Sequence, residues 1–100
     1  MIMDIKKNGN GGTLEIALSG RLDTTTAPQL ETEIKASVDG VTELILNIKD
    51  LEYVSSAGLR VILSTQKIMN KQGKLIIRNV CPSVMEVFEI TGFSDILTIE

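Results

Sequence analysis

The sequence predicts one α/β domain, with a mixed β-sheet that begins as an N-terminal hairpin and with helices packed on one face of that sheet. Two strand patterns separated by a glycine-rich turn open the chain, and helix and strand patterns then alternate to its end. A chain of 100 residues has room for one hydrophobic core, so we expect a single domain over residues 1–100. Right-handed crossovers between parallel strands bring their helices to the same face.

The hairpin is predicted over residues 2–19. Leucine and isoleucine alternate with polar or small residues between positions 14 and 18, which is the period of a strand with one buried face. Residues 8–12, with the sequence Asn-Gly-Asn-Gly-Gly, tolerate the positive φ angles of a tight turn. We therefore expect two antiparallel strands at the start of the sheet.

The first helix is expected after the segment Asp23–Thr26. Thr26 and Gln29 have the separation of a capping box, in which two side chains satisfy free N–H groups at a helix start. Gly40 is the expected end of this helix. Its apolar residues share one helical face and are Ala27, Leu30, Ile34 and Val38.

A buried strand and a second helix follow. Residues 42–48 are β-branched and leucine-rich without alternation, as in a central strand that is buried on both faces. The second helix is expected from about residue 57 to residue 71, and Gly73 stops it. Leu59 and Leu63 fall on the boundary between its two faces. The inward residues are Val61, Ile62, Thr65, Ile68 and Met69, and the outward residues are Arg60, Ser64, Lys67 and Lys71.

The remaining residues predict two short strands around a third helix. Residues 75–77 form the first of these strands, Pro82 begins the helix and Gly92 ends it. Residues 96–99 form the last strand. One side of the helix is expected to be lined by Val84, Val87, Phe88 and Thr91.

The composition excludes several classes of function. A net charge of −3, without a cluster of lysine and arginine or an aromatic stacking surface, argues against nucleic-acid binding. The chain has no histidine and a single cysteine, Cys81, so we expect no metal site, no cofactor and no internal disulfide. Cys81 lies at a helix start, and with no second cysteine to resolve an oxidised form we interpret it as structural.

The chain also has none of the sequence features of a membrane or secreted protein. No apolar run approaches the roughly 20 residues of a membrane span. The first seven residues carry charges and no long apolar segment, so no secretory signal is predicted. We therefore expect a cytoplasmic protein without membrane contact, whose partner is another protein.

The segment Asp50–Leu59 is the most informative about function, because it places two hydroxyl groups at a helix start. Backbone N–H groups have no intrahelical partner there, so they bind a capping hydroxyl or a phosphate. Ser55 and Ser56 are therefore open to two interpretations, a structural N-cap and a phosphorylation switch. Catalysis is not expected, because no histidine can activate a serine and Val54 breaks the Gly-x-Ser-x-Gly pattern of hydrolases.

Three motifs in this order resemble those of the STAS-domain anti-sigma-factor antagonists, which are small bacterial regulators of partner-switching circuits. Gly20–Asp23 resembles the Gly-x-Leu-Asp motif of that family, and Tyr53–Leu59 resembles its aromatic-x-Asp-Ser-Ser/Thr-Gly-Leu signature. Residues 79–93 resemble its closing strand and helix. The resemblance extends over the whole chain and implies the STAS fold.

The resemblance implies a protein that is a substrate and ligand of enzymes and is not itself an enzyme. In this family the unphosphorylated form binds a serine-kinase anti-sigma factor and frees the sigma factor, phosphorylation releases the partner, and a PP2C-type phosphatase resets the cycle. Aligned on Gly58, the phosphorylated serine is Ser56. Ser55 stands where many members have aspartate, and Ala57 where they have serine or threonine, which leaves Ser55 as a second or competing phosphorylation site.

The same resemblance implies a partner-binding surface around the helix start. Asp23 matches a loop aspartate associated with the phosphorylation site and the kinase contact, and a turn residue before a helix is its alternative role. For Leu59 and Leu63 the alternative to partner contact is core packing, and for Arg60 it is simple solvation. The predicted partner-binding residues are Asp23, Thr24, Ser55, Ala57, Gly58, Leu59, Arg60 and Leu63.

The alternative function is a STAS interaction or scaffold module of a signalling or transport complex whose serine is not phosphorylated. The two functions share one fold and differ only in the chemistry at Ser56. A Ser56→Asp substitution that abolishes partner binding in a folded chain indicates the switch, and one that leaves binding unchanged indicates the unregulated module.

Overall fold

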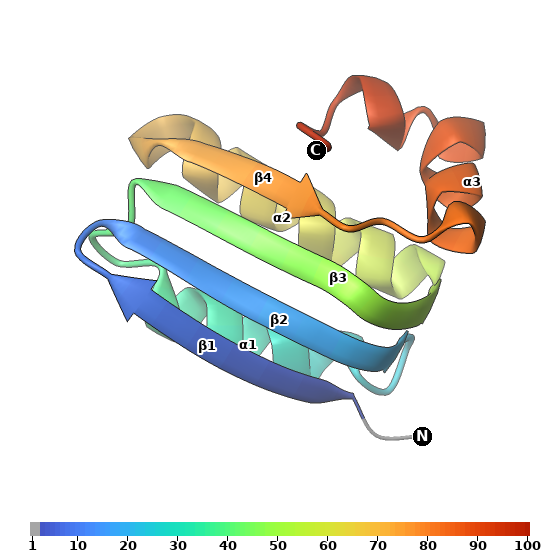
Figure 1. The fold of residues 1–100 in the computed structure, drawn as a ribbon, viewed down its shortest axis with the longest axis horizontal. Helices are drawn as coiled ribbons and strands as arrows, with labels where there is room; N and C mark the ends of the chain where they lie inside the picture. Colours follow the sequence, from blue (N-terminus) through green and yellow to red (C-terminus); the bar gives the residue numbers. More distant parts are fainter. Residues whose placement is uncertain (1–2) are drawn as a thin grey trace.

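The computed structural model describes residues 3–100, so residue 2, the first position of the predicted hairpin, lies outside the described residues. Figure 1 shows the strands side by side in one sheet, with helices behind the sheet and at one end of it. In chain order the elements are β1 (Asp4–Asn10), β2 (Thr13–Leu22), α1 (Ala27–Ser37), β3 (Glu43–Val54), α2 (Ser56–Gln72), β4 (Lys74–Arg78), α3 (Pro82–Thr91) and the 3₁₀ helix η1 (Phe93–Asp95).

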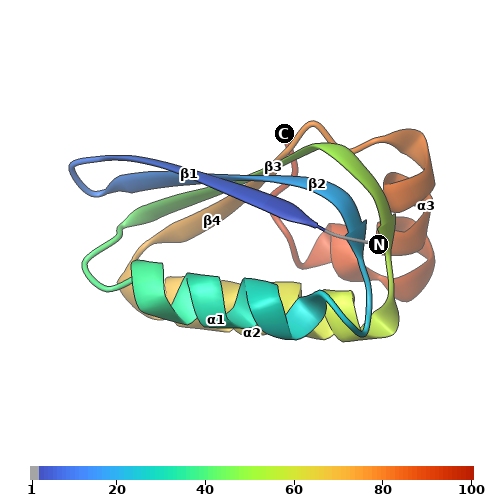
Figure 2. The same cartoon turned by 90° about the horizontal axis from the view of Figure 1, so that it is seen from below.

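The sheet is mixed, as the sequence predicts. Its strand order is β1-β2-β3-β4, with β1 antiparallel to β2 and the other neighbours parallel. Gly11, with a φ of 66°, supplies a left-handed conformation in the turn of the β1–β2 hairpin. α1 and α2 cover one face of the sheet, whereas α3 packs at the end where β3 and β4 finish (Figures 1 and 2). The predicted α/β architecture is confirmed.

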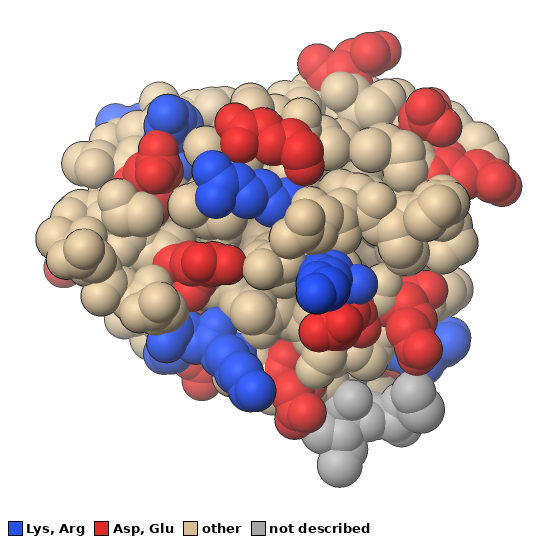
Figure 3. Space-filling view, in the orientation of Figure 1, with Lys and Arg blue, Asp and Glu red and all other residues tan. Residues whose placement is uncertain are grey.

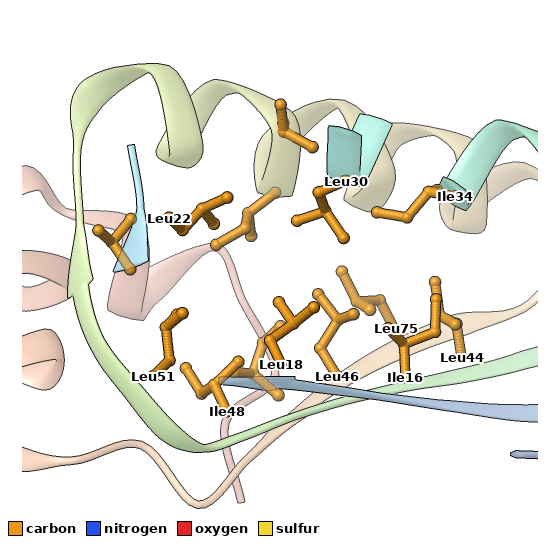
Figure 4. Packing of buried hydrophobic residues seen from close by; sticks show 14 of the residues in the cluster. Ile16, Leu18, Leu22, Leu30, Ile34, Leu44, Leu46, Ile48, Leu51 and Leu75 are labelled. Carbon is orange, nitrogen blue, oxygen red and sulfur yellow. The ribbon is translucent and has the colours of Figure 1, made fainter. Parts of the chain in front are cut away.

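The hydrophobic core lies between the sheet and the layer of α1 and α2 (Figure 4). β3 buries Leu44, Ile45 and Leu46 in succession, as predicted for a central strand. Ile45 points to the face without helices, where its neighbour in register is the buried Ile76 of β4. Burial of each leucine or isoleucine side chain contributes roughly 1.5–3 kcal/mol. Core residues labelled in Figure 4 are Ile16, Leu18, Leu22, Leu30, Ile34, Leu44, Leu46, Ile48, Leu51 and Leu75.

The face of the sheet away from α1 and α2 is polar and charged. Figure 3 shows acidic and basic side chains interspersed over this face. Lys74 pairs with Glu43 at 3.1 Å, and Arg78 pairs with Glu100 at 3.3 Å. Exposed ion pairs of this kind contribute at most about 1 kcal/mol each, so the stability of the fold comes mainly from the core.

The capping box predicted at the start of α1 does not form. The Thr26 hydroxyl donates to the carbonyl oxygen of Arg21 at 2.8 Å and accepts the N–H of Asp23, also at 2.8 Å. The hydroxyl is therefore committed to the loop between β2 and α1 and is not available to the helix. Gln29 points elsewhere, and its Nε2 donates to the carbonyl oxygen of Met3 at 3.4 Å.

The prediction of a strand over residues 96–99 is wrong, apart from a single bridge between Ile99 and Ile77 of β4. The chain reaches this segment through the 3₁₀ helix η1, and Leu97 is buried in the core. The Ile77 N–H then donates to the carbonyl oxygen of Thr98, and the Ile77 carbonyl oxygen accepts the N–H of Glu100, both at 2.8 Å. Leu97 and Ile99 thus pack on the core whereas Ile96 is exposed, and only Ile99 pairs with β4.

Candidate functional site at the start of helix α2

The bend at the end of β3 brings the start of α2 beside β2. β3 carries one extra residue relative to β2 between Asn47 and Asp50, and another between Leu51 and Tyr53. Bulges of this kind bend a strand and increase its twist. Figure 2 shows β3 curving out of the sheet toward the helix layer, where it continues into α2. The end of β2 and the start of α2 are therefore neighbours.

Ser55 is the N-cap of α2. Its backbone is extended, with φ −92° and ψ 175°, and its Oγ accepts the N–H of Gly58 at 3.3 Å. The N–H of Ser55 donates to the carbonyl oxygen of Leu22 at 2.8 Å, which ties the cap to the end of β2. The fold thus uses both the hydroxyl and the N–H of this half-buried serine.

Gly58 lets α2 approach β2 closely. A Cβ at this position would lie 2.6 Å from Cγ of Leu22 and 3.0 Å from the Leu22 carbonyl oxygen, so a larger residue forces the helix away. Gly58 is buried, and Leu59 is only 7% exposed. Gly58 has no side chain to present to a partner, and Leu59 packs in the core, which was the alternative to a partner contact. Both residues instead fix the position of the helix start.

Ser56 is the first residue of α2 and is exposed. Within residues 3–100 its hydroxyl has no hydrogen-bond partner, whereas the hydroxyl of Ser55 has one. The free N–H groups of the first turn and the positive end of the helix dipole lie close to it. A modifying enzyme can therefore reach Ser56 without breaking a contact that the fold needs.

Asp23 organises the loop between β2 and α1. Its Oδ1 accepts the hydroxyl of Thr25 at 2.7 Å, the N–H of Thr25 at 3.0 Å and the N–H of Thr26 at 3.2 Å. These hydrogen bonds, with that of the Thr25 hydroxyl first, lower the pKa of Asp23 below its usual value. Asp23 directly follows Leu22, whose carbonyl oxygen accepts the N–H of Ser55. Asp23 therefore also lies beside the start of α2.

Arg21 and Tyr53 form a surface pair that the sequence patterns did not single out. The two residues are opposite each other in β2 and β3, and the guanidinium carbon of Arg21 lies 4.1 Å from the centroid of the Tyr53 ring. The Arg21 Nε is 4.0 Å from Oδ2 of Asp23. Tyr53 is 40% exposed, so the pair extends the surface next to the loop. Only the register of the two strands reveals this contact.

A groove between α1 and α2, here called the α1–α2 groove, opens beside Ser56. It has a volume of about 330 Å³ and brings together Thr24, Ala57 and Arg60, three of the predicted partner-binding residues. Leu63 is half-buried further along α2 and does not line the groove. The residues that line the α1–α2 groove are Thr24, Ala27, Pro28, Glu31, Ala57, Arg60 and Val61.

The start of α3 carries Cys81 near the bent part of β3. Its Sγ lies 3.5 Å from the carbonyl oxygen of Leu51 and 3.4 Å from Oγ of Ser83, and the Ser83 hydroxyl lowers the pKa of the thiol. Within residues 3–100, no group of three or more His, Cys, Asp and Glu side chains is arranged to hold a metal ion. No helix in the described part of the chain has both the length and the apolar character needed to cross a bilayer.

The chain is similar in sequence to proteins of a known family. Residues 4–100 match the STAS domain family. A Bordetella bronchiseptica protein named as an anti-sigma factor antagonist, BtrV, is 42% identical over 90 residues, covering 88% of this chain and 78% of that protein. The anti-sigma-B factor antagonist of Bacillus subtilis is 32% identical over 98 residues, covering 97% of this chain and 88% of that protein.

Solved structures share the fold. An anti-sigma factor antagonist from Mycobacterium paratuberculosis matches with a TM-score of 0.89 at 23% identity, over 98% of this chain and 85% of that one. The anti-sigma factor antagonist SpoIIAA in its unphosphorylated form matches with a TM-score of 0.84 at 24% identity, over 97% of this chain and 88% of that one. Phosphorylated SpoIIAA from Bacillus matches with a TM-score of 0.76 at 23% identity, over 97% of this chain and 91% of that one. With a family match over nearly its whole length and the fold of these proteins, the chain belongs to the STAS domain family.

Proposed function

We propose that this chain is a cytoplasmic anti-sigma factor antagonist that works as a phosphorylation switch. Its unphosphorylated form binds a serine-kinase anti-sigma factor, which then releases its sigma factor. Phosphorylation of Ser56 by that kinase ends the complex, and a PP2C-type phosphatase restores the binding form. The names of the sequence relatives support this function, as do the SpoIIAA structures in unphosphorylated and phosphorylated forms.

The observation that carries the proposal is the different use of two adjacent serines. Ser55 caps α2 through the Gly58 N–H at 3.3 Å, while the exposed Ser56 hydroxyl takes no part in the fold. A phosphate on Ser55 would crowd a half-buried cap. On Ser56 it adds roughly 1.5 to 2 negative charges at an exposed helix start, where free N–H groups and the helix dipole favour an anion. We therefore assign capping to Ser55 and phosphorylation to Ser56.

Charge and solvation explain how phosphorylation releases the partner. The Asp23 carboxylate lies in the loop beside the start of α2, and like any aspartate of ordinary or lowered pKa it is negatively charged near neutral pH. A partner that covers this surface must remove water from the phosphate as well, which is costly unless the partner supplies matching cations. We expect little change in the folded chain, because an exposed helix N-terminus accommodates a phosphate. The switch therefore acts on affinity, and the chain serves as substrate and ligand.

The test compares the partner recovered with tagged Ser56→Ala and Ser56→Asp chains from the native host. Ser56→Ala should retain the serine-kinase partner, and Ser56→Asp should recover at least about tenfold less of it. Both variants should melt at the wild-type temperature. Ser83→Asp is the matched control, because it places the same charge on an exposed residue in the first turn of α3 and should bind as wild type does.

Equal recovery of the partner with Ser56→Asp and with the wild-type chain would contradict the switch. It would favour the alternative function, an unphosphorylated interaction or scaffold module of a signalling or transport complex.

A further inference from the structure

We infer that the α1–α2 groove is the docking site for an apolar side chain of the kinase that phosphorylates Ser56, an inference that rests on the proposed function. Ala57 follows Ser56 in the chain and lines the groove, so a protein seated there has the acceptor hydroxyl at its edge. Thr24 lines it from the loop that Asp23 organises. The groove therefore adjoins both parts of the proposed phosphorylation surface.

The floor of the groove is apolar. Ala27 is 3% exposed and Val61 is 7% exposed, and both line it. Ala27 on α1 and Ala57 on α2 have short side chains, which leave a space between the two helices. Apolar and aromatic side chains that fill such spaces are the anchors that carry most of the energy of an interface. The occupant that matches this floor is an apolar side chain.

The charges at the rim describe the rest of the partner segment. Arg60 is exposed and makes no salt bridge within residues 3–100. Glu31 lies across the groove on α1, and its only ion pair in that range is a long, exposed contact of 4.0 Å with Lys35. One cation and one anion thus flank the floor on opposite helices. This arrangement suits a protein segment in which charged residues of both signs surround an apolar one, and it does not suit a small anion.

The test changes the α1 wall of the groove, which lies outside the tryptic peptide that contains Ser56. Pro28→Arg places a long charged side chain at an exposed position of the wall. Ala36→Arg places the same side chain on an exposed position of α1 outside the groove and is the matched control. Each variant is produced in the native host, and the fraction of peptide 50–60 that is phosphorylated on Ser56 is measured by mass spectrometry. Thermal melting of each purified variant shows that it is folded.

The phosphorylated fraction should fall about tenfold in Pro28→Arg and stay at the wild-type level in Ala36→Arg. A second variant, Thr24→Arg, places the same side chain at an exposed position on the loop side of the groove and should show the same loss. Wild-type phosphorylation in both groove variants, with wild-type melting, would overturn this inference and leave the proposed function intact. A wild-type chain that never carries the phosphate would instead overturn the proposed function, and this inference with it.

Discussion

Helices α2 and α3 both begin after a parallel strand at the same end of the sheet, yet their starts are built differently. α2 begins with a serine that caps it and a glycine that brings it against Leu22, so two contacts tie it to β2. α3 begins at Cys81, whose Sγ lies 3.5 Å from the carbonyl oxygen of Leu51 in β3 but makes no capping hydrogen bond, and Pro82 presets the first turn. The start of α2, which carries Ser56, is thus both capped and closely packed on β2, whereas the start of α3 has no side-chain cap. A rigid site of this kind supports the proposed role of Ser56 as the target of an enzyme.

Among substitutions at the two helix starts, Gly58→Ala is expected to have the largest effect on stability. The added methyl group would lie 2.6 Å from Cγ of Leu22, so α2 must move away from β2. Overpacking of this kind should lower the free energy of unfolding by about 2 kcal/mol. Gly9→Ala is the control, since a Cβ there meets no atom closer than 3.6 Å. Urea denaturation measures both variants, and equal midpoints would show that the start of α2 is not closely packed.

The two cap residues can be compared directly. Ser55→Ala removes the acceptor of the Gly58 N–H and should cost about 1 kcal/mol of unfolding free energy. Cys81→Ala removes a side chain that does not cap α3, so we expect a change below about 0.5 kcal/mol. Urea midpoints again provide the measurement. If the two substitutions cost the same, the difference between the helix starts has no energetic basis.

Arg21→Ala tests whether the surface pair beside the loop helps to fix this region. Loss of the stack on Tyr53, at 4.1 Å, should cost about 0.5 to 1 kcal/mol at an exposed site. Arg21→Lys should recover only part of that loss, because lysine keeps the charge without the planar guanidinium. Tyr53 is the only tyrosine in a chain without tryptophan, so its fluorescence during unfolding reports on this contact. Unchanged stability and fluorescence in Arg21→Ala would show that the stack is energetically neutral.

The smallest effect concerns pH. Hydrogen bonds from Thr25 and Thr26 lower the pKa of Asp23 from its usual value of 3.8, so the carboxylate stabilises the fold above that pH. This contribution is lost as the pH falls through the lowered pKa. Asp23→Asn should therefore be less stable than wild type at pH 7, and the difference should shrink below about pH 4. Asp39→Asn, at an exposed aspartate outside the loop, is the control. A deficit that does not depend on pH would contradict a role for the charge.

Periodicity predicted most of the fold, because each pattern reflects one buried face of one element. Alternation located β2, and helical spacing located α1 and α2. The predictions of a capping box and of a last strand were wrong because the residues concerned make tertiary contacts instead. The Thr26 hydroxyl binds the loop, and Leu97 is buried in the core.

Less of the candidate site could be predicted. The position of the helix start left capping and phosphorylation open at both Ser55 and Ser56, and it was the family resemblance, aligned on Gly58, that implied phosphorylation of Ser56 with Ser55 as a second or competing site. The hydrogen bond from the Gly58 N–H to Ser55 Oγ is the feature that distinguishes them. The pairing of Arg21 with Tyr53 and the α1–α2 groove depend on strand register and on the spacing of two helices, which no local pattern encodes.

The central claim is that Ser55 is the cap of α2 and Ser56 is the phosphate acceptor. Phosphopeptide mass spectrometry of the chain isolated from its native host, with and without stress, tests this claim most directly. Trypsin releases residues 50–60, and fragment ions that separate the two serines locate the phosphate. We predict a phosphate on Ser56 whose level changes with the condition. A phosphate on Ser55, or none on a peptide that is well detected, would contradict the claim.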